Sequence, residues 1–210
     1  MARNCFYSFH YKPDNWRSSQ VRNIGVIEGN SPASDNDWEA VTEGGDDAIK
    51  GWISAQMKGR TCAVILVGAG TANRKWINYE IVRAWDDGLG VVGICVHGLK
   101  NFSGETSSKG NNPFDYIGYG STGKKLSSIV KCYDPGGSNS KERYNWISAH
   151  LANAVEEAIK IRKSVTAHPR FDAGSLDGLV GGYSMGDHDW HGHGQLDSSF
   201  ACPYCPTSAN

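Results

Sequence analysis

The residues best placed for chemistry lie between Gly68 and Ile81, where an apolar run ends in a glycine-containing turn and a helical pattern begins. Trp76 and Glu80 are four residues apart, so we expect them to be neighbours on the helix surface. A carboxylate beside an indole can have a raised pKa or meet a cationic ligand. The indole face can also stack on a flat ring. Trp76 and Glu80 could therefore contact a cationic or a planar ligand, although spacing alone does not single Glu80 out.

Spacing alone also allows a simpler interpretation of the same residues. Glu80 could pair with Arg83 or Arg74 on a solvated helix face. The turn at Gly68 and Gly70 lacks the full GxGxxG dinucleotide fingerprint, which argues against a Rossmann oxidoreductase.

A second group of aromatic and polar residues runs from Phe6 to Arg17. It is expected to end the first strand and to open the next helix. Phe9 and its aromatic neighbours could be simple core packing. Alternatively, His10, Tyr11 and Arg17 could line a nucleotide site, with Arg17 close to a phosphate.

The elements that must position these residues follow from short apolar runs and helical spacings. Strands are predicted at Cys5–Phe9, Cys62–Val67, Val91–Val96 and Ser128–Tyr133, with a weaker one at Ile24–Ile27. Helices are predicted at Asp46–Met57, Asn73–Trp85 and Asn139–Arg162, with Gly88 ending the second of these.

This alternation predicts an α/β fold, a doubly wound parallel sheet of five strands in the flavodoxin-like arrangement. Ligands of such sheets bind outside the carboxyl ends of the strands, near the switch in strand order. The crevice should therefore be lined by Ser8–Arg17, Gly68–Trp76 and His97–Asn101.

Two stretches do not fit the repeat. Gly98–Gly123 is long and rich in Gly, Ser and Asn, and we interpret it as a functional loop, for example a lid. Residues 166–210 are interpreted as a loosely ordered or docked extension to a domain of residues 1–165. The extension contains His188, His191 and a Cys202–Cys205 pair, but this spacing matches no zinc pattern, and we expect no metal site.

Composition narrows the class of protein further. The chain has 210 residues and a net charge of −1, which gives no electrostatic footprint for a nucleic-acid partner. No apolar run approaches the length needed to cross a membrane, and the N-terminus lacks a signal-peptide pattern. Cys62 and Cys95 lie within apolar runs, as in proteins of a reducing compartment. A cytoplasmic protein without a membrane partner is expected.

Several ordered motifs together resemble the TIR-like family of bacterial antiphage defence, and most closely its Thoeris sensor subunits. They are Tyr7–Tyr11 with Asp14–Arg17, Ala48–Ile53, Ala63–Gly68, Asn73–Ile81 and Lys109–Tyr119. The resemblance covers roughly residues 3 to 160.

The resemblance implies an enzyme that cleaves NAD⁺ after phage infection and needs no cofactor, since NAD⁺ is its substrate. It implies Glu80 as the catalytic residue, because the catalytic glutamate of TIR enzymes lies on the helix after the third strand. Ser8, Phe9, His10, Tyr11, Arg17, Gly68 and Trp76 are then the expected substrate-binding residues.

The product implied is a cyclic ADP-ribose-type signal that activates a separate effector protein. The trigger supplied by the phage is not identified by the resemblance, and assembly into a homo-oligomer is compatible with it. Two other hypotheses stay open at this point. One is a non-enzymatic TIR-like scaffold that binds a nucleotide or oligomerises, and the weaker one is a module for FMN or phosphoryl transfer.

Overall fold

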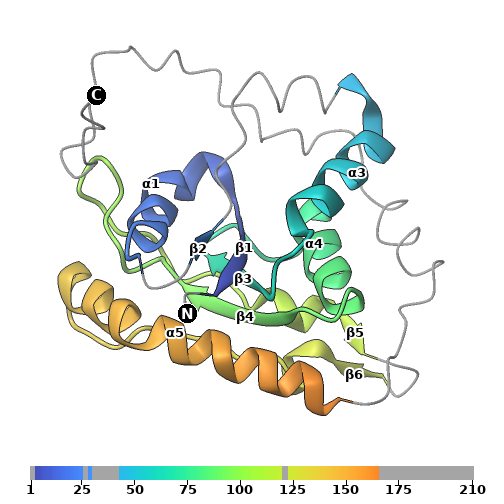
Figure 1. Cartoon of the computed structure of the whole chain (residues 1–210). Coiled ribbons are helices and arrows are strands. Elements are labelled where there is room, and N and C mark those ends of the chain that lie inside the picture. The colour runs from blue at the N-terminus through green and yellow to red at the C-terminus, as the bar shows by residue number, and fades with distance from the viewer. Residues whose placement is uncertain (1–2, 26–27, 30–42, 120–122, 166–210) are drawn as a thin grey trace, which may run out of the picture.

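A computed structural model describes residues 3–25, 28–29, 43–119 and 123–165 of the chain. Its central feature is a five-stranded sheet in the order β2-β1-β3-β4-β7, with all neighbouring strands parallel (Figure 1). These strands span Asn4–Phe9 (β1), Glu28–Gly29 (β2), Cys62–Val67 (β3), Gly90–Cys95 (β4) and Cys132–Tyr133 (β7). The α/β class and the parallel sheet predicted from the sequence are confirmed.

Helices connect the strands in the expected alternation. They are α1 (Tyr11–Arg22), α3 (Gly45–Met57), α4 (Lys75–Asp86) and α5 (Ser140–Ser164). The predicted extents of the last three agree with these bounds to within two residues. None of the described helices combines the length and the apolar character that a membrane span requires.

Two hydrophobic clusters cover the two faces of the sheet, because strand side chains alternate between faces. Phe6, Ile65 and Val91 pack with α3 and α4, whereas Tyr7, Leu66 and Ile94 pack with α1 and α5. All residues of β3 and β4 are buried, as is typical of inner parallel strands covered on both sides. The switch in strand order lies between β1 and β3, and the helices that follow these two strands, α1 and α4, cover opposite faces of the sheet.

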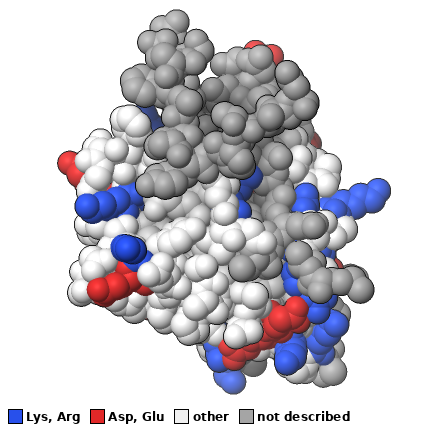
Figure 2. All heavy atoms as spheres, turned by 60° about the vertical axis from the view of Figure 1, so that its left-hand side comes forward, with Lys and Arg blue, Asp and Glu red and all other residues white. Residues whose placement is uncertain are grey.

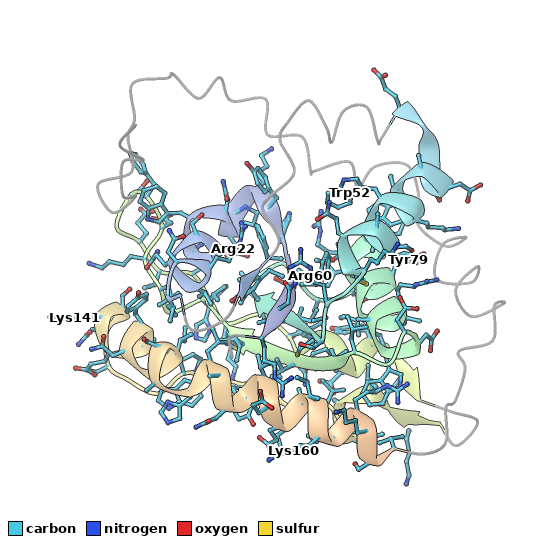
Figure 3. The ribbon with its side chains drawn as sticks, in the orientation of Figure 1. Arg22, Trp52, Arg60, Tyr79, Lys141 and Lys160 are labelled. Carbon is cyan, nitrogen blue, oxygen red and sulfur yellow. The ribbon has the colours of Figure 1, made fainter. Side chains whose placement is uncertain are left out.

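Polar groups lie outside these clusters. In Figure 3, Lys141 and Lys160 project from the outer side of α5, while Trp52 and Tyr79 mark the α3–α4 side of the molecule. Figure 2 shows blue and red side chains near one another on the visible face, without a continuous field of one sign among the coloured residues. Exposed pairs such as Arg3–Glu156 add little stability, because water and salt screen them.

Two strand predictions were wrong in position. The weak strand expected at Ile24–Ile27 is replaced by β2 at Glu28–Gly29, and residues 26–27 lie outside the described part of the chain. The run expected at Ser128–Tyr133 forms a strand only at its last two residues. Before it, the N–H groups of Ile129 and Val130 donate to the Leu126 carbonyl, so a helical turn buries the apolar side chains instead.

The described residues of the long segment Gly98–Gly123 include short helical and strand elements. It contains the 3₁₀ helix η1 (Pro113–Tyr116), whose Asn112 side chain accepts a hydrogen bond from the Phe114 N–H at 3.1 Å. Strand β5 (Gly118–Tyr119) then pairs antiparallel with β6 (Lys124–Lys125), ahead of the turn η3 (Leu126–Ser128). Buried Phe114 and Ile117 fix this part of the segment to the core. The expected extension at 166–210 lies outside the described residues, and the domain boundary at 165 stays a prediction.

Gly88 ends α4 as predicted, with φ +82°. The Gly88 N–H donates to Trp85 O and the Leu89 N–H to Ala84 O, which is the Schellman arrangement. Replacement by alanine should lower the free energy of unfolding by about 1 kcal/mol, since a Cβ is unfavourable in this backbone region.

Gly51 provides the matched control, because it lies on the exposed side of α3 with open space around it. Gly51→Ala should raise the free energy of unfolding by roughly 0.5–1 kcal/mol through helix propensity. Urea unfolding of both variants measures the two effects. Changes of the same sign would contradict this account of Gly88.

Candidate active site

Ser8 and Glu80 meet beneath the carboxyl edge of the sheet. Ser8 lies on β1 beside Ile65 of β3, and alternation along β1 turns its side chain toward α4. Its Oγ donates to Glu80 Oε2 at 2.5 Å, and both residues are almost fully buried. The pairing joins two residues that the sequence predicted for the site, although they are 72 positions apart.

The surroundings of Glu80 favour its neutral form. Burial raises its pKa from 4.5 to about 8, and the hydrogen bond from Ser8 partly opposes this shift. Arg83, a partner suggested by spacing alone, instead bonds Asp87 at 2.8 Å. Among the described residues, no basic side chain lies within ion-pair distance of Glu80. A cationic ligand at Glu80 would therefore meet no competing basic side chain from the described part of the chain.

Gly68 allows three segments to meet at van der Waals contact. A Cβ at Gly68 would overlap the carboxylate of Asp14 on α1, and a Cβ at Gly110 would overlap the Gly68 carbonyl. Thr71 holds the turn from within, since its Oγ1 accepts a hydrogen bond from the Gly68 N–H at 2.9 Å. The glycines predicted from the sequence thus serve close backbone approach at the switch in strand order.

His10 and Tyr11 lie at the start of α1, directly after β1. His10 occupies the N-cap position and is 9% exposed, and its Nδ1 would lie 3.3 Å from a Cβ on Gly70. The rings of Phe9 and Tyr11 stack with centroids 6.2 Å apart. His10 therefore borders the same turn as Gly68, as expected.

Phe9 and Ser8 point to opposite faces of β1. Phe9 belongs to the core cluster of α1 and α5, together with Val96 and Leu99. Its side chain is 7% exposed, so its contribution is mainly to packing. The simpler interpretation of Phe9 is the one that the structure supports.

Arg17 is buried and bonded to protein groups rather than presented to solvent. Its guanidinium donates to the carbonyls of Pro13, Leu99 and Glu105 and to Asp14 Oδ1, at 2.8–3.1 Å. These bonds tie the beginning of the long loop to α1. The arrangement supports a positioning role for Arg17 and does not support the expected phosphate contact.

Trp76 lies half-buried on α4, where its ring makes an edge contact with Tyr79 at 5.9 Å between centroids. The ammonium group of Lys75 lies 4.7 Å from the indole centroid and is also bonded to Asp46 of α3. These contacts place Trp76 on the α3 side of the site.

Two buried polar residues were missed as candidates, and of these Asp14 contacts the turn at Gly68. Asp14 is 1% exposed, and its Oδ2 has no hydrogen-bond partner among the described residues. Burial raises its pKa, against the effect of Arg17. Asn78 is fully buried, and neither of its amide atoms has a partner within the described part of the chain. Asp14 could have been found from the sequence, because it lies four residues after His10 and such residues are neighbours on one side of a helix. Nothing in the sequence distinguishes Asn78.

Comparisons with known proteins identify the relatives of this chain. The family model described as "Thoeris protein ThsB, TIR-like domain" matches residues 6–101. A relative from Bacillus cereus (strain MSX-D12), named "Putative cyclic ADP-D-ribose synthase ThsB1", is 36% identical over 133 residues. That match covers 60% of this chain and 69% of the relative. The chain belongs to the Thoeris ThsB TIR-like family.

The matched range in this ThsB-family chain includes every predicted site residue, from Ser8 to Glu80. It ends at residue 101, within the long loop that Arg17 holds. The segments brought together at Gly68 thus belong to the family's domain, apart from Gly110, which follows the matched range.

The raised pKa of Glu80 has a consequence for stability. Because the folded pKa of about 8 lies above the ordinary value of 4.5, the folded chain binds more protons than the unfolded chain between these values. The contribution of Glu80 to the free energy of unfolding should therefore decline as pH rises from about 4.5 through about 8. Glu80→Gln should remove this part of the pH dependence of the free energy of unfolding, because glutamine does not titrate.

Denaturant unfolding of both proteins at several pH values across this window measures the difference. The stability gain of Glu80→Gln over the parent should grow with pH. A constant difference between the two proteins would show that Glu80 does not titrate with a raised pKa.

Proposed function

We propose that this ThsB-family chain cleaves the bond between nicotinamide and ribose in NAD⁺. The observation that carries the proposal is the buried Glu80 carboxyl group, which is held by Ser8 and has no basic partner among the described residues. Nicotinamide in NAD⁺ is a planar cation, and cleavage passes through a cationic, oxocarbenium-like ribose. A carboxylate in a water-poor site stabilises such developing charge.

One carboxylate is sufficient for this reaction. Nicotinamide leaves as a neutral molecule, so no acid is needed to protonate the leaving group. The electron pair of the broken C–N bond stays on the nicotinamide nitrogen, and the positive charge passes to the ribosyl group. Glu80 in its ionised form would then face the charged carbon.

The second half of the reaction determines the product. We propose a cyclic ADP-ribose-type nucleotide, in which another group of the same molecule captures the ribosyl carbon in place of water. The name of the 36% identical relative, a cyclic ADP-D-ribose synthase, supports this class of product. Exclusion of water is what cyclisation requires. The long loop, whose Gly110 lies against the Gly68 carbonyl, is placed to contribute to it.

In the cell, we propose a role in antiphage defence. The chain would respond to infection by a phage, and the nucleotide would diffuse to a separate effector protein and activate it. Membership of the Thoeris family supports this arrangement. The scaffold hypothesis makes the opposite prediction, that NAD⁺ stays intact during infection.

Glu80→Gln should lower the rate of nicotinamide release from NAD⁺ by at least about a hundredfold, because the neutral amide cannot stabilise the cationic transition state. Glu43→Gln is the matched control, since Glu43 is an exposed residue that receives the same chemical change. Mass spectrometry of nucleotides from phage-infected cells that express each protein gives the measurement. Full NAD⁺ consumption by Glu80→Gln, or intact NAD⁺ with the parent protein, would refute the proposed chemistry.

Ligand binding should also be coupled to proton release. The cationic nicotinamide favours ionised Glu80 and so lowers its pKa from about 8, and one proton should leave on binding near pH 7. Affinity for a non-cleavable NAD⁺ analogue should therefore increase as pH rises toward about 8.

Calorimetry in buffers with different ionisation enthalpies measures the released proton. ADP-ribose is the matched ligand, because it has the same phosphates and adenosine but no nicotinamide, and it should release fewer protons. Equal proton release by the two ligands would argue against a contact between Glu80 and the nicotinamide ribosyl cation.

A further inference from the structure

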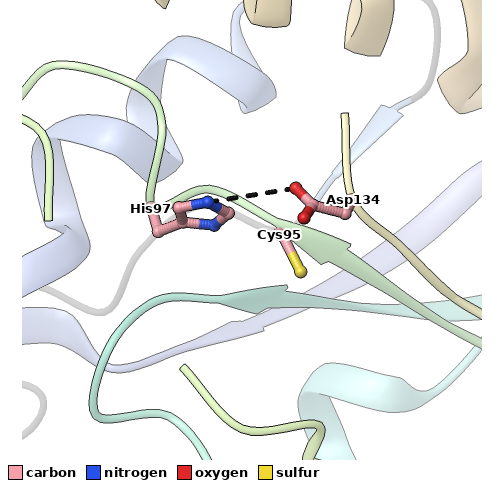
Figure 4. Close-up of side chains that lie close together, drawn as sticks. All are labelled: Cys95, His97 and Asp134. Atoms are coloured by element: carbon pink, nitrogen blue, oxygen red, sulfur yellow. Dashed lines mark ion pairs between the residues drawn. The ribbon is translucent and has the colours of Figure 1, made fainter. Parts of the chain in front are cut away.

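A second cluster of chemically competent side chains lies at the carboxyl ends of β4 and β7 (Figure 4). Cys95 is the last residue of β4, His97 follows two residues later, and Asp134 comes directly after β7. Their sulfur, nitrogen and oxygen ligand atoms all lie within 4.8 Å of one another. These are the three ligand types that proteins use for zinc.

Cys132 is the candidate fourth ligand beside this group of three residues. Its Sγ lies 3.9 Å from Sγ of Cys95 on the neighbouring strand. Two thiolates on one tetrahedral Zn²⁺, each with a bond of about 2.3 Å, lie about 3.8 Å apart. Gly93 makes room for this approach, because a Cβ there would lie 2.8 Å from the Cys132 sulfur. The spacing of the two sulfur atoms thus already suits a shared metal ion.

We propose that Cys95, Cys132, His97 and Asp134 bind one Zn²⁺ ion. The thiolates favour Zn²⁺ over Mg²⁺ and Ca²⁺, which prefer oxygen ligands. This site could not be expected from the sequence, because its ligands come from two separate strand ends. The proposal does not depend on the cleavage of NAD⁺.

The charges around the cluster suit a metal site with these ligands. Two thiolates, one carboxylate and Zn²⁺ have a net charge of −1. Lys109 Nζ lies 2.8 Å from Asp134 Oδ2, and Arg143 Nη1 lies 3.2 Å from Asp134 Oδ1. These cations offset the negative charge and orient the carboxylate, which has enough lone pairs to bond both a metal ion and a cation.

The metal would also hold the start of the long loop in place, because His97 directly precedes it. The His97 carbonyl accepts a hydrogen bond from the Ser107 N–H at 2.9 Å, and Lys109 binds Asp134 at the other side of the loop. Gly110, the next residue, lies against Gly68 beside the candidate active site. Zn²⁺ bound at β4 and β7 would thus hold the loop against the turn at Gly68.

The test uses the purified full chain, reduced with a phosphine and stripped of metal with a chelator. Titration with Zn²⁺ in competition with a chromophoric chelator should show one tight equivalent, and Zn²⁺ should raise the melting temperature. Titration with Co²⁺ should give thiolate-to-metal charge-transfer absorption and the intense visible bands of tetrahedral cobalt. Cys132→Ser and Asp134→Asn should each weaken Zn²⁺ binding by at least about tenfold.

Cys202→Ser/Cys205→Ser is the matched control, because it removes the one Cys-x-x-Cys pair of the sequence. This double variant should retain the tight equivalent. Circular dichroism identifies any variant that fails to fold, and Asp134→Asn alters a partly exposed residue and leaves both sulfur atoms in place. The proposal is overturned if the reduced chain binds no stoichiometric Zn²⁺, or if binding is lost with Cys202 and Cys205 while folded Cys132→Ser and Asp134→Asn retain it.

Discussion

A carboxyl group kept out of water is the constraint around which the site is built. Glu80 has one hydroxyl partner, Ser8, and one such hydrogen bond does not replace the hydration that an ionised carboxylate loses. The packing of α4 must therefore hold the group in place. Ile77, Ile81 and Ala84 do so from fully buried positions on the same helix. The hydrophobic core and the reactivity of the carboxyl group are thus parts of one arrangement.

Much of the fold could be predicted, including the place of Glu80 on a helix, because these follow from local patterns, whereas the proposed role of Glu80 came from the family resemblance. The inner strands are continuous apolar runs, and α4 has a regular apolar face that ends at Gly88. The different surroundings of Ser8 and Phe9 could also have been predicted, since adjacent side chains of a strand point to opposite faces of the sheet. The helical turn near Val130 could not, because a short apolar run suits a strand and a buried turn equally well.

The partners of individual polar groups depend on contacts between distant segments. Arg17 resembled a phosphate ligand in the sequence, yet its acceptors include carbonyls 82 and 88 residues away. The contact between Asp14 and Gly68 likewise requires the exact approach of α1 to the turn after β3. The sequence shows which groups can form hydrogen bonds, but the packing of distant segments determines which acceptors they reach.

The end of α5 determines where the chain leaves the described domain. Arg162 donates to the Trp85 carbonyl at 2.9 Å, and its guanidinium lies 4.8 Å from the Trp85 ring, so the last turn of α5 is attached near the end of α4. Both helices begin at the carboxyl edge of the sheet and end at the amino edge, away from the candidate active site. Lys163 is exposed on that last turn. A fluorophore attached there would report on association of the molecule through this edge without occupying the space that a nucleotide needs.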